Sequence, residues 1–273
     1  MSKNPSSRRI KLITNPGAGN MSQASKNLEE VTRHLTGHGF EVDIALAKPT
    51  EEATPIARKA VKKGYPLIIA MGGDHTITAV IQGMADSDAQ LGIIPSGTEN
   101  DIAASLGIPE DMQAACDIIA SGHTRLLDLA QISTKDKKKF IFFMVTAVGL
   151  TATIFPAIKD VPHGDFSNIK DAILTFLEFQ PTPKVFLTLD DESKIAVETM
   201  LVTVTNTPLI GVKNLVAPEA SMEDGLLDVA VYPDFSKSEM LAYFARTAKE
   251  GYVEDGKIQR YRAKKIKIKT EPK

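Results

Sequence analysis

The stretch AMGGDHTITAV, residues 70–80, joins two patterns that together decide the fold class. The run 66–71 that enters this stretch has no charged side chain and predicts a strand buried on both faces of a sheet. Two glycines, an aspartate and a threonine close the run, and the apolar pattern beyond them predicts a helix to about Met84. A buried strand, a glycine turn and a helix form the repeating unit of a parallel α/β sheet.

The same unit recurs throughout the first half of the sequence. Strands are predicted at residues 8–14, 40–47, 66–71 and 90–95. Helices are predicted at about residues 22–37, 51–64, 77–84, 100–106 and 110–121. Short apolar strands that alternate with helices predict a Rossmann-like parallel sheet with helices on both faces.

The second half of the sequence has a different organisation. Its strands are predicted at residues 138–149, 184–190, 192–206, 225–233 and 263–271, and its helices at residues 166–180 and 236–251. Successive strands with few helices between them predict a mostly antiparallel β domain. The change falls near residues 127–131, so we expect two domains, at residues 1–128 and 129–273.

The composition and charge of the sequence exclude some classes of protein. A formal net charge of -2 over 273 residues excludes a polycationic nucleic-acid-binding chain. Residues 257–273 are basic, as in a solvated strand face or a segment attracted to an anionic surface. The single Cys116 lies in an amphipathic helix pattern and is expected in the core. No apolar run approaches the ~20 residues of a membrane span, and the N-terminus lacks a signal-peptide pattern, so we expect a cytoplasmic protein.

Three glycine-containing loops follow predicted strands, and the carboxyl ends of parallel strands share one edge of a sheet, where ligands bind. The first loop, TNPGAGN, places Gly17 and Gly19 before a helix whose N-terminus favours anions. Glycine and proline also mark ordinary strand-to-helix turns, so this loop alone does not separate a ligand site from a plain turn.

The second loop, residues 72–76, is more specific. Gly72 and Gly73 permit a tight turn and a close phosphate approach. Asp74 could orient a nucleophile, hold a magnesium-linked water or only cap the next helix, and Thr76 could cap that helix or bind a phosphate oxygen. His75 stands where a third small residue is usual; if the loop demands a positive φ there, a side chain costs on the order of 1 kcal/mol. Its imidazole could also donate a hydrogen bond to a phosphate.

The third loop lies within residues 94–109. Gly97 and Thr98 could make a further phosphate or ribose contact, and Asn100 and Asp101 begin a predicted helix. An acidic residue there is favourable as a cap alone, but the Asn-Asp pair could also bind a metal or fix the loop. None of the three loops matches a Walker sequence, a GxGxxG fingerprint or a GxSxG elbow, and the His and Cys residues lack zinc-ligand spacing.

The segments NPGAG, GGDHT and PSGTENDIAASLGIP, in this order, resemble the diacylglycerol kinase catalytic-domain family, which includes bacterial lipid kinases and the sphingosine and ceramide kinases. The later segments DLAQI (128–132), AVGLTATI (147–154) and APEASMEDGLLDVAVY (217–232) match its pattern too. The resemblance implies an ATP-binding α/β domain followed by a β-sandwich domain that faces the lipid. The implied reaction transfers the γ-phosphoryl group of ATP to a lipid hydroxyl, with Mg²⁺ as cofactor.

The resemblance also implies site residues by matching position. With the glycine loops, the predicted nucleotide-binding set is Asn15, Pro16, Gly17, Ala18, Gly19, Gly72, Gly73, Asp74, His75, Thr76, Gly97 and Thr98. The catalytic-site acids are Asp74, Asp101 and Asp128, of which Asp74 is the preferred one. The Mg²⁺ ligands are the carboxylate of Asp224 and the carbonyls of Ser221 and Leu226. Without the resemblance, EDGLLD is simply an Asp-Gly turn before a strand.

The sequence departs from the family pattern at four places. GGDHT replaces GGDGT, Thr78 and Ala79 replace an Asn-Glu pair, and Thr151 stands at an acidic position. The family's DGE sequence, whose carboxylate is the expected base on the lipid hydroxyl, would follow a lysine-rich strand, and the given sequence ends there at Lys273. Glu254 precedes that strand, so we do not assign it this role. Turnover would therefore need another acid or a longer chain.

Three functions stay open at this point. The first is a lipid kinase acting on diacylglycerol or a related lipid, which needs peripheral contact with a membrane surface rather than a span. Apolar residues within 149–166 could form a lipid-facing lip or a covered core element. The second is a nucleotide- or lipid-binding pseudoenzyme of the same fold. The third is an NAD-kinase-like enzyme, which shares the GGD loop but lacks segments such as EDGLLDV.

Overall fold

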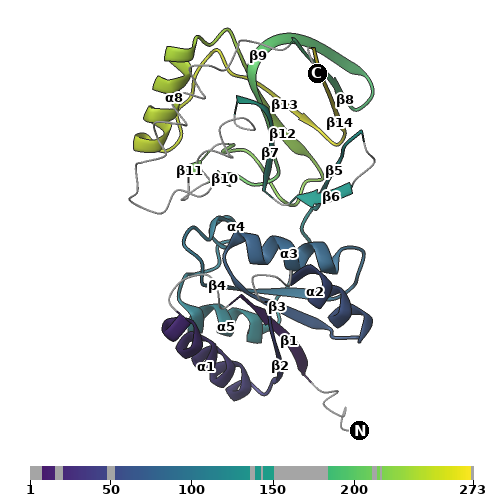
Figure 1. Cartoon of the computed structure of the whole chain (residues 1–273), viewed down its shortest axis with the longest axis vertical. Helices are drawn as coiled ribbons and strands as arrows, with labels where there is room; N and C mark the ends of the chain where they lie inside the picture. The colour runs from purple at the N-terminus through teal and green to yellow at the C-terminus, as the bar shows by residue number, and fades with distance from the viewer. Residues whose placement is uncertain are drawn as a thin grey trace. The chain divides into compact units, whose positions relative to one another are not determined.

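The computed structural model describes residues 8–15, 21–47, 53–135, 139–142, 144–150, 184–210, 214–215 and 217–271 (Figure 1). These residues separate into two compact units. The N-terminal unit holds the described residues up to Leu127 and those within 131–142. The C-terminal unit holds Asp128–Ala130 and the described residues from Met144 onward. No helix in these ranges is both long and apolar enough to cross a bilayer.

The N-terminal unit is built on a four-stranded parallel sheet. Its strands are β1 (Arg9–Thr14), β2 (Glu41–Leu46), β3 (Leu67–Gly72) and β4 (Gln90–Pro95), in the order β2-β1-β3-β4. β3 is buried along almost its whole length, because it is central and both of its faces are covered. The predicted parallel α/β class is confirmed for this unit.

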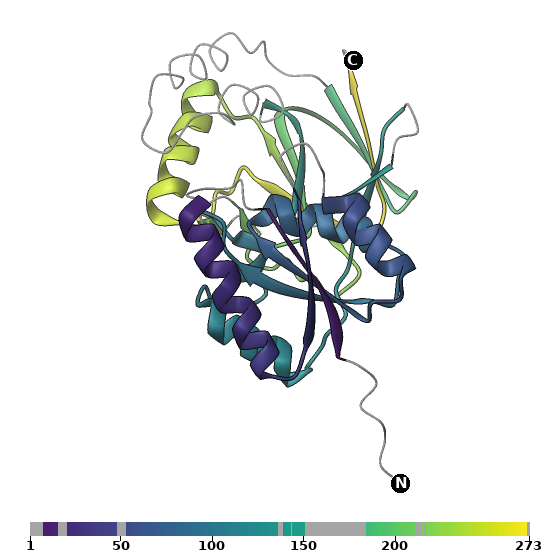
Figure 2. The ribbon, with the colours of Figure 1, turned by 60° about the horizontal axis from the view of Figure 1, so that its bottom comes forward.

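Helices cover both faces of this sheet (Figure 2). α1 (Met21–Gly37) and α5 (Met112–Ser121) cover one face, and α2 (Ala53–Lys62) and α3 (Asp74–Met84) the other. The core under α1 and α5 consists of Ile10, Leu12, Val31, Leu35, Ile69, Met71, Ile94, Ala115 and Cys116. Cys116 is thus the core residue that its helix pattern predicts. On the other face α2 and α3 pack closely at Gly83, where a Cβ would lie 2.3 Å from the carbonyl oxygen of Thr54.

A two-stranded sheet of β5 (Ala130–Ser133) and β6 (Lys139–Phe142) follows α5 in the chain. β6 contacts α3, and the side chain of Gln82 donates a hydrogen bond to the carbonyl of Ile141. The single strand predicted at residues 138–149 is therefore wrong. Its residues form two strands, β6 and β7 (Val145–Gly149), which belong to different sheets.

The C-terminal unit is built on an antiparallel sheet, which confirms the second part of the predicted fold class. Its path is β13 (Gln259–Ala263), β12 (Leu227–Pro233), β9 (Ser193–Thr205), β8 (Lys184–Leu189) and β14 (Ile266–Glu271), and β7 also pairs with β9. β10 (Leu209–Ile210) and β11 (Asn214–Leu215) form a separate short pair. β13 was not predicted from the sequence. The helix predicted at residues 166–180 lies outside the described residues.

The long strand β9 serves two sets of partners. Residues 193–198 pair with β8, and their burial alternates as expected for a sheet with one exposed face. Residues 199–205 pair with β12, and β7 pairs with 201–205. This second half is almost completely buried. One strand therefore passes from a half-exposed part of the sheet into its core.

α8 (Lys237–Glu250) packs on the core of the C-terminal unit. A capping box begins the helix: Ser236 accepts a hydrogen bond from the amide of Glu239, and the Glu239 carboxylate accepts one from the amide of Ser236. Tyr243 makes edge contacts with Tyr232 and Phe235. The helix predicted at residues 236–251 is present with nearly the same ends.

Candidate functional site

The loops that leave β3 and β4 touch through their backbones at one edge of the parallel sheet. The amide of Ser96 donates to the carbonyl of Gly72 over 3.1 Å. A Cβ added to Gly97 would lie 2.4 Å from the Cα of Gly73, which is closer than real Cβ contacts come. Gly73 and Gly97 are therefore required for this close approach, and their backbone atoms are left without covering side chains of their own.

Asn100 fixes the conformation of the second of these loops. The backbone of Asn100 is in the left-handed region, with φ of 55°, and the residue is buried. The side-chain Oδ1 accepts from the amide of Gly97 at 2.9 Å, and Nδ2 donates to the Gly97 carbonyl at 3.0 Å. Asparagine tolerates this backbone region better than most residues do. The sequence left three roles open for the Asn100–Asp101 pair, namely a helix cap, a metal site or fixing the loop, and these hydrogen bonds show that Asn100 fixes the loop.

Asp74 links the two loops. It is the first residue of α3, and its carboxylate accepts from the amides of Asp101 at 3.1 Å and Ile102 at 2.8 Å. These amides begin α4 (Asp101–Ser105), so Asp74 caps a helix that starts 27 residues later in the chain. A negative charge is favourable there. The expected cap exists, but it acts on α4 rather than on the helix that Asp74 itself begins.

A group of carboxylates surrounds this cap. Asp74, Glu99 and Asp101 each offer one oxygen, and the three oxygens lie within 4.8 Å of one another. Asp101 is buried and Glu99 is exposed. Carboxylate oxygens are the donors that Mg²⁺ prefers, so this donor set fits that cation. Glu99 was not among the predicted site residues, although it lies between two of them.

The remaining predicted residues of this edge differ in exposure. His75 is exposed, is the second residue of α3 and does not have a positive φ, so the strain considered for it does not arise. Thr76 is buried against Gly72, and the N-cap of α3 is Gly73 without a side-chain cap, so Thr76 does not cap that helix. Thr98 is exposed. Asn15 directly follows β1, and Pro16, Gly17, Ala18 and Gly19 lie outside the described residues.

A second cluster of predicted residues lies in the C-terminal unit, around Asp128. Its Oδ2 accepts from the amide of Gly225 at 2.7 Å, and its own amide donates to the carbonyl of Met222 at 2.7 Å. The side chain of Asn206 donates to the Asp128 carbonyl at 3.1 Å. The segment DLAQI and the loop at residues 221–226 are thus in direct contact. Asn206 is buried and was missed by the sequence reading.

The loop at residues 221–226 is closed by its own hydrogen bonds. Oδ1 of Asp224 accepts from the amide of Leu226 at 2.9 Å, and Ser221 Oγ accepts from the amide of Glu223 at 3.2 Å. Oδ2 of Asp224 forms an ion pair with Arg262. A cation held by Ser221, Asp224 and Leu226 would have oxygen donors that suit it but would share Asp224 with this guanidinium.

Arg262 also approaches a second carboxylate, with its Nε 3.3 Å from Oδ1 of Asp228. Burial raises the pKa of Asp228, and the positive charge of Arg262 opposes that rise. Oδ2 of Asp228 is buried without a hydrogen-bond partner among the described residues. Arg262 lies 38 residues beyond Asp224, in β13, and nothing in the local sequence pattern indicated this contact.

Comparison with known proteins gives two family matches that together span most of the chain. Residues 9–132 match the diacylglycerol kinase catalytic domain, and residues 148–273 match the YegS C-terminal NAD kinase beta sandwich-like domain. The chain is 28% identical over 263 residues to a diacylglycerol kinase of Mycobacterium tuberculosis (strain ATCC 25618 / H37Rv), covering 95% of this chain and 84% of the relative. It is 29% identical over 276 residues to one of Bacillus subtilis (strain 168), covering 97% and 87%.

The fold is likewise shared with a known structure. A crystal structure of a diacylglycerol kinase from Bacillus anthracis str. Sterne matches with a TM-score of 0.73 at 24% identity, covering 98% of this chain and 88% of that one. The loops of β3 and β4 lie within the first family match, and the loop at residues 221–226 lies within the second. The chain belongs to the diacylglycerol kinase catalytic-domain family and carries the C-terminal domain of the YegS type.

Proposed function

We propose that this chain is an ATP-dependent lipid kinase that transfers the γ-phosphoryl group to a hydroxyl of diacylglycerol or a related lipid. The observation that carries the proposal is the backbone contact of Gly73 with Gly97 beside the carboxylates of Asp74, Glu99 and Asp101. Phosphoryl transfer depends mainly on positioning and on neutralising charge. Backbone atoms that no side chain covers can position the phosphates, and the neighbouring carboxylate oxygens can hold Mg²⁺, which would neutralise charge.

The glycine loops are the proposed contact surface for the ATP phosphates. Gly72, Gly73 and Gly97 have no side chain to block a close approach, and α3 begins at this edge with its amides. Thr98 and His75 are exposed there and can donate hydrogen bonds to phosphate oxygens. The other proposed contacts are Thr76 and the first loop, Asn15, Pro16, Gly17, Ala18 and Gly19.

The acids of this edge have distinct proposed roles. Asp74 is a positioning residue, because its hydrogen bonds to the amides of Asp101 and Ile102 fix where α4 begins. Asp101 is held beside it and, with Asp74 and Glu99, would hold Mg²⁺. Bound Mg²⁺ would neutralise charge on the triphosphate. Asp128, tied to the loop at residues 221–226, is the proposed acid of the C-terminal unit.

The loop of Ser221, Asp224 and Leu226 is proposed as a further Mg²⁺ site with a structural role. The Asp224 carboxylate and the carbonyls of Ser221 and Leu226 are oxygen donors that suit Mg²⁺, and an ion held there would add to the hydrogen bonds and the Arg262 ion pair that already close the loop before β12. A lipid substrate also requires contact with a membrane surface, which we propose to be peripheral and on the cytoplasmic side.

The proposal is tested with radiolabelled ATP and Mg²⁺, using diacylglycerol, phosphatidylglycerol, sphingosine, undecaprenol and NAD as separate acceptors. We expect label in a lipid and none in NAD. We expect Asp74→Asn and Asp101→Asn to reduce kcat/KM for that lipid by at least about 100-fold, since each disturbs charge placement in the transition state.

Asp86→Asn is the matched control. Asp86 is exposed with φ of 62°, a backbone region that asparagine adopts readily, and it lies outside this edge. Its variant should keep full activity. Label in NAD alone would overturn the lipid assignment, and ATP binding without label in any acceptor would identify a pseudoenzyme.

A further inference from the structure

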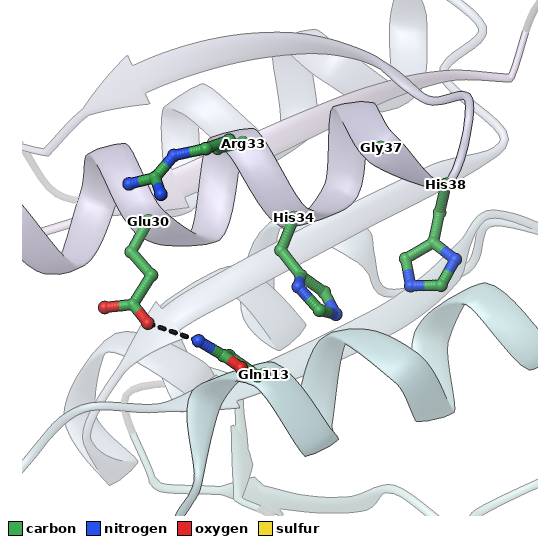
Figure 3. Close-up of a pocket in the computed structure, with 6 residues that line it drawn as sticks. All are labelled: Glu30, Arg33, His34, Gly37, His38 and Gln113. Atoms are coloured by element: carbon green, nitrogen blue, oxygen red, sulfur yellow. Dashed lines mark hydrogen bonds between the residues drawn. The ribbon is translucent and has the colours of Figure 1, made fainter.

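Two histidines and an aspartate converge between α1 and α5, on a part of the N-terminal unit that the proposed reaction does not use. Nε2 of His34 and Nε2 of His38 each lie 2.8 Å from Oδ1 of Asp117. Figure 3 shows both imidazoles projecting from the end of α1 toward α5. They line a shallow cavity whose other lining residues are Glu30, Arg33, Gly37 and Gln113.

The backbone holds the two imidazoles at a chelating separation. They are four residues apart, a ligand spacing that was not recognised from the sequence, and the amide of His38 still donates to the carbonyl of His34 at 3.2 Å, so the helical turn continues past the last residue of α1. Residues four apart on a helix lie on one face. The rings pack edge to face with centroids 5.1 Å apart, and both Nε2 atoms face Oδ1 of Asp117.

The geometry of these atoms is close to what a tetrahedral metal requires. Ligand atoms about 2.0–2.1 Å from zinc are separated from one another by about 3.4 Å. The three donor atoms here already lie within 4.8 Å of one another, and the two N–O distances are 2.8 Å. Small side-chain rotations would therefore open room for an ion, with no movement of either helix backbone.

We propose that His34, His38 and Asp117 form a binding site for a transition-metal dication of the zinc type that ties α1 to α5. Two imidazoles and one carboxylate suit Zn²⁺, Co²⁺ or Ni²⁺, whereas Mg²⁺ prefers oxygen donors throughout. The side chains are 29% to 59% exposed, so an ion can enter from solvent and water can complete its coordination. The site is distinct in its donors from the carboxylates of the candidate nucleotide edge.

The test uses the full chain, first freed of metal with a chelator and then titrated with Zn²⁺ by calorimetry and with Co²⁺ by visible absorption. We expect one saturable site, a tetrahedral Co²⁺ spectrum and a higher Tm with Zn²⁺, because a ligand of the folded state stabilises it. Binding should survive about a hundredfold excess of Mg²⁺.

The variants separate a metal site from a hydrogen-bonded contact between helices. His34→Gln and Asp117→Asn keep polar groups that can hydrogen-bond, yet each should weaken Zn²⁺ binding by at least about tenfold. His123→Gln is the control, since His123 lies outside the cluster and contacts Ser121. No saturable binding, or equal affinity in all four proteins, would overturn the proposal and leave the cluster as a hydrogen-bonded contact only.

Discussion

Gly97 supports the whole β3–β4 edge because no side chain fits between it and Gly73. A Cβ on Gly97 would lie 2.4 Å from a backbone atom, which cannot move aside as a flexible side chain could. We expect Gly97→Ala to lower the free energy of unfolding by about 1–3 kcal/mol and to abolish ATP binding. Denaturant unfolding and nucleotide titration measure the two effects.

Gly37→Ala is the control for that substitution. No atom lies within 4 Å of a Cβ at Gly37, which ends α1 and has no positive φ. Alanine should be neutral there or stabilising by up to about 1 kcal/mol, because it has the higher helix propensity. Equal effects of the two variants would show that the backbone contact at Gly97 does not matter.

His75 departs from the family's usual glycine without any backbone strain. It is exposed on the first turn of α3, so its side chain fills no packed space. We expect His75→Gly to keep or improve ATP binding, while stability falls by at most about 1 kcal/mol from the lower helix propensity of glycine. Fluorescent nucleotide titration checks the affinity. Complete loss of binding would mean that the imidazole supplies most of the affinity for the nucleotide, rather than one dispensable hydrogen bond.

At the scale of elements, the stability of the start of α8 depends on pH through the charge of Glu239. A hydrogen bond from Lys257 and those from Ser236 lower the pKa of Glu239 to about 2, against an ordinary value of 4.5. A lowered pKa stabilises the fold above pH 4.5, and this contribution is lost as the pH falls toward 2. Glu239→Gln should therefore be less stable than the parent at pH 7, with the difference shrinking below about pH 4.5.

Denaturant unfolding followed by circular dichroism at several pH values measures this difference. Glutamine is accepted at this position of a capping box, so the substitution removes mainly the charge. Glu254→Gln, at an exposed glutamate, serves as the control and should follow the parent at each pH. A constant difference between Glu239→Gln and the parent over the whole range would contradict the assignment.

Most elements could be predicted from the sequence because their hydrophobic periodicity is strong. β3 and β4 are apolar runs between turns, β1 begins with alternating charged and apolar residues, and α8 is bounded by Ser236 and Gly251. β13 was missed because its sequence QRYRA has little apolar alternation and only its last residue is fully buried. Pairing with β12 makes it a strand, and such pairing is not visible locally.

The sequence predicted which loops form the candidate site, but it did not predict which residues of these loops contact one another. Glycine and acidic residues after apolar strands marked the β3–β4 edge. That Asp74 caps α4, or that Arg262 pairs with Asp224, depends on contacts 27 and 38 residues apart in the chain. From the sequence, the caps of α3 and α4 were expected to come from adjacent residues. In the structure, the amides at the start of α4 donate instead to the carboxylate of Asp74, at the start of α3.

At the scale of the whole molecule, each of the two units has a hydrophobic core among its described residues, and the single cysteine of the chain lies in one of them. Cys116 lies in the core of the N-terminal unit, and burial raises the pKa of its thiol to about 11. The native protein should react very slowly with Ellman's reagent at neutral pH and completely in denaturant, since the thiolate is the reactive form.

Two core substitutions then distinguish the units. Val31→Ala removes core contacts beside Cys116, and Leu201→Ala removes them from the other core. We expect only Val31→Ala to shift labelling to lower denaturant, by an amount that corresponds to about 1–4 kcal/mol. An equal shift from Leu201→Ala would mean that the two units unfold as one.

Because β9 pairs with two sets of strands, the position of an inserted residue or peptide in this part of the chain decides how many strand pairings it disturbs. Insertion of a single residue within 199–205 would put every later side chain of the strand on the opposite face, against both β7 and β12 at once. The turn at residues 190–192 has two exposed aspartates with positive φ, but Asp190 exchanges hydrogen bonds with the backbone of Lys265, and Asp191 forms ion pairs with Lys265 and Lys267. An affinity tag or a reporter peptide therefore belongs neither in the buried half of β9 nor in this turn, because an insertion in either place would disturb contacts with neighbouring strands.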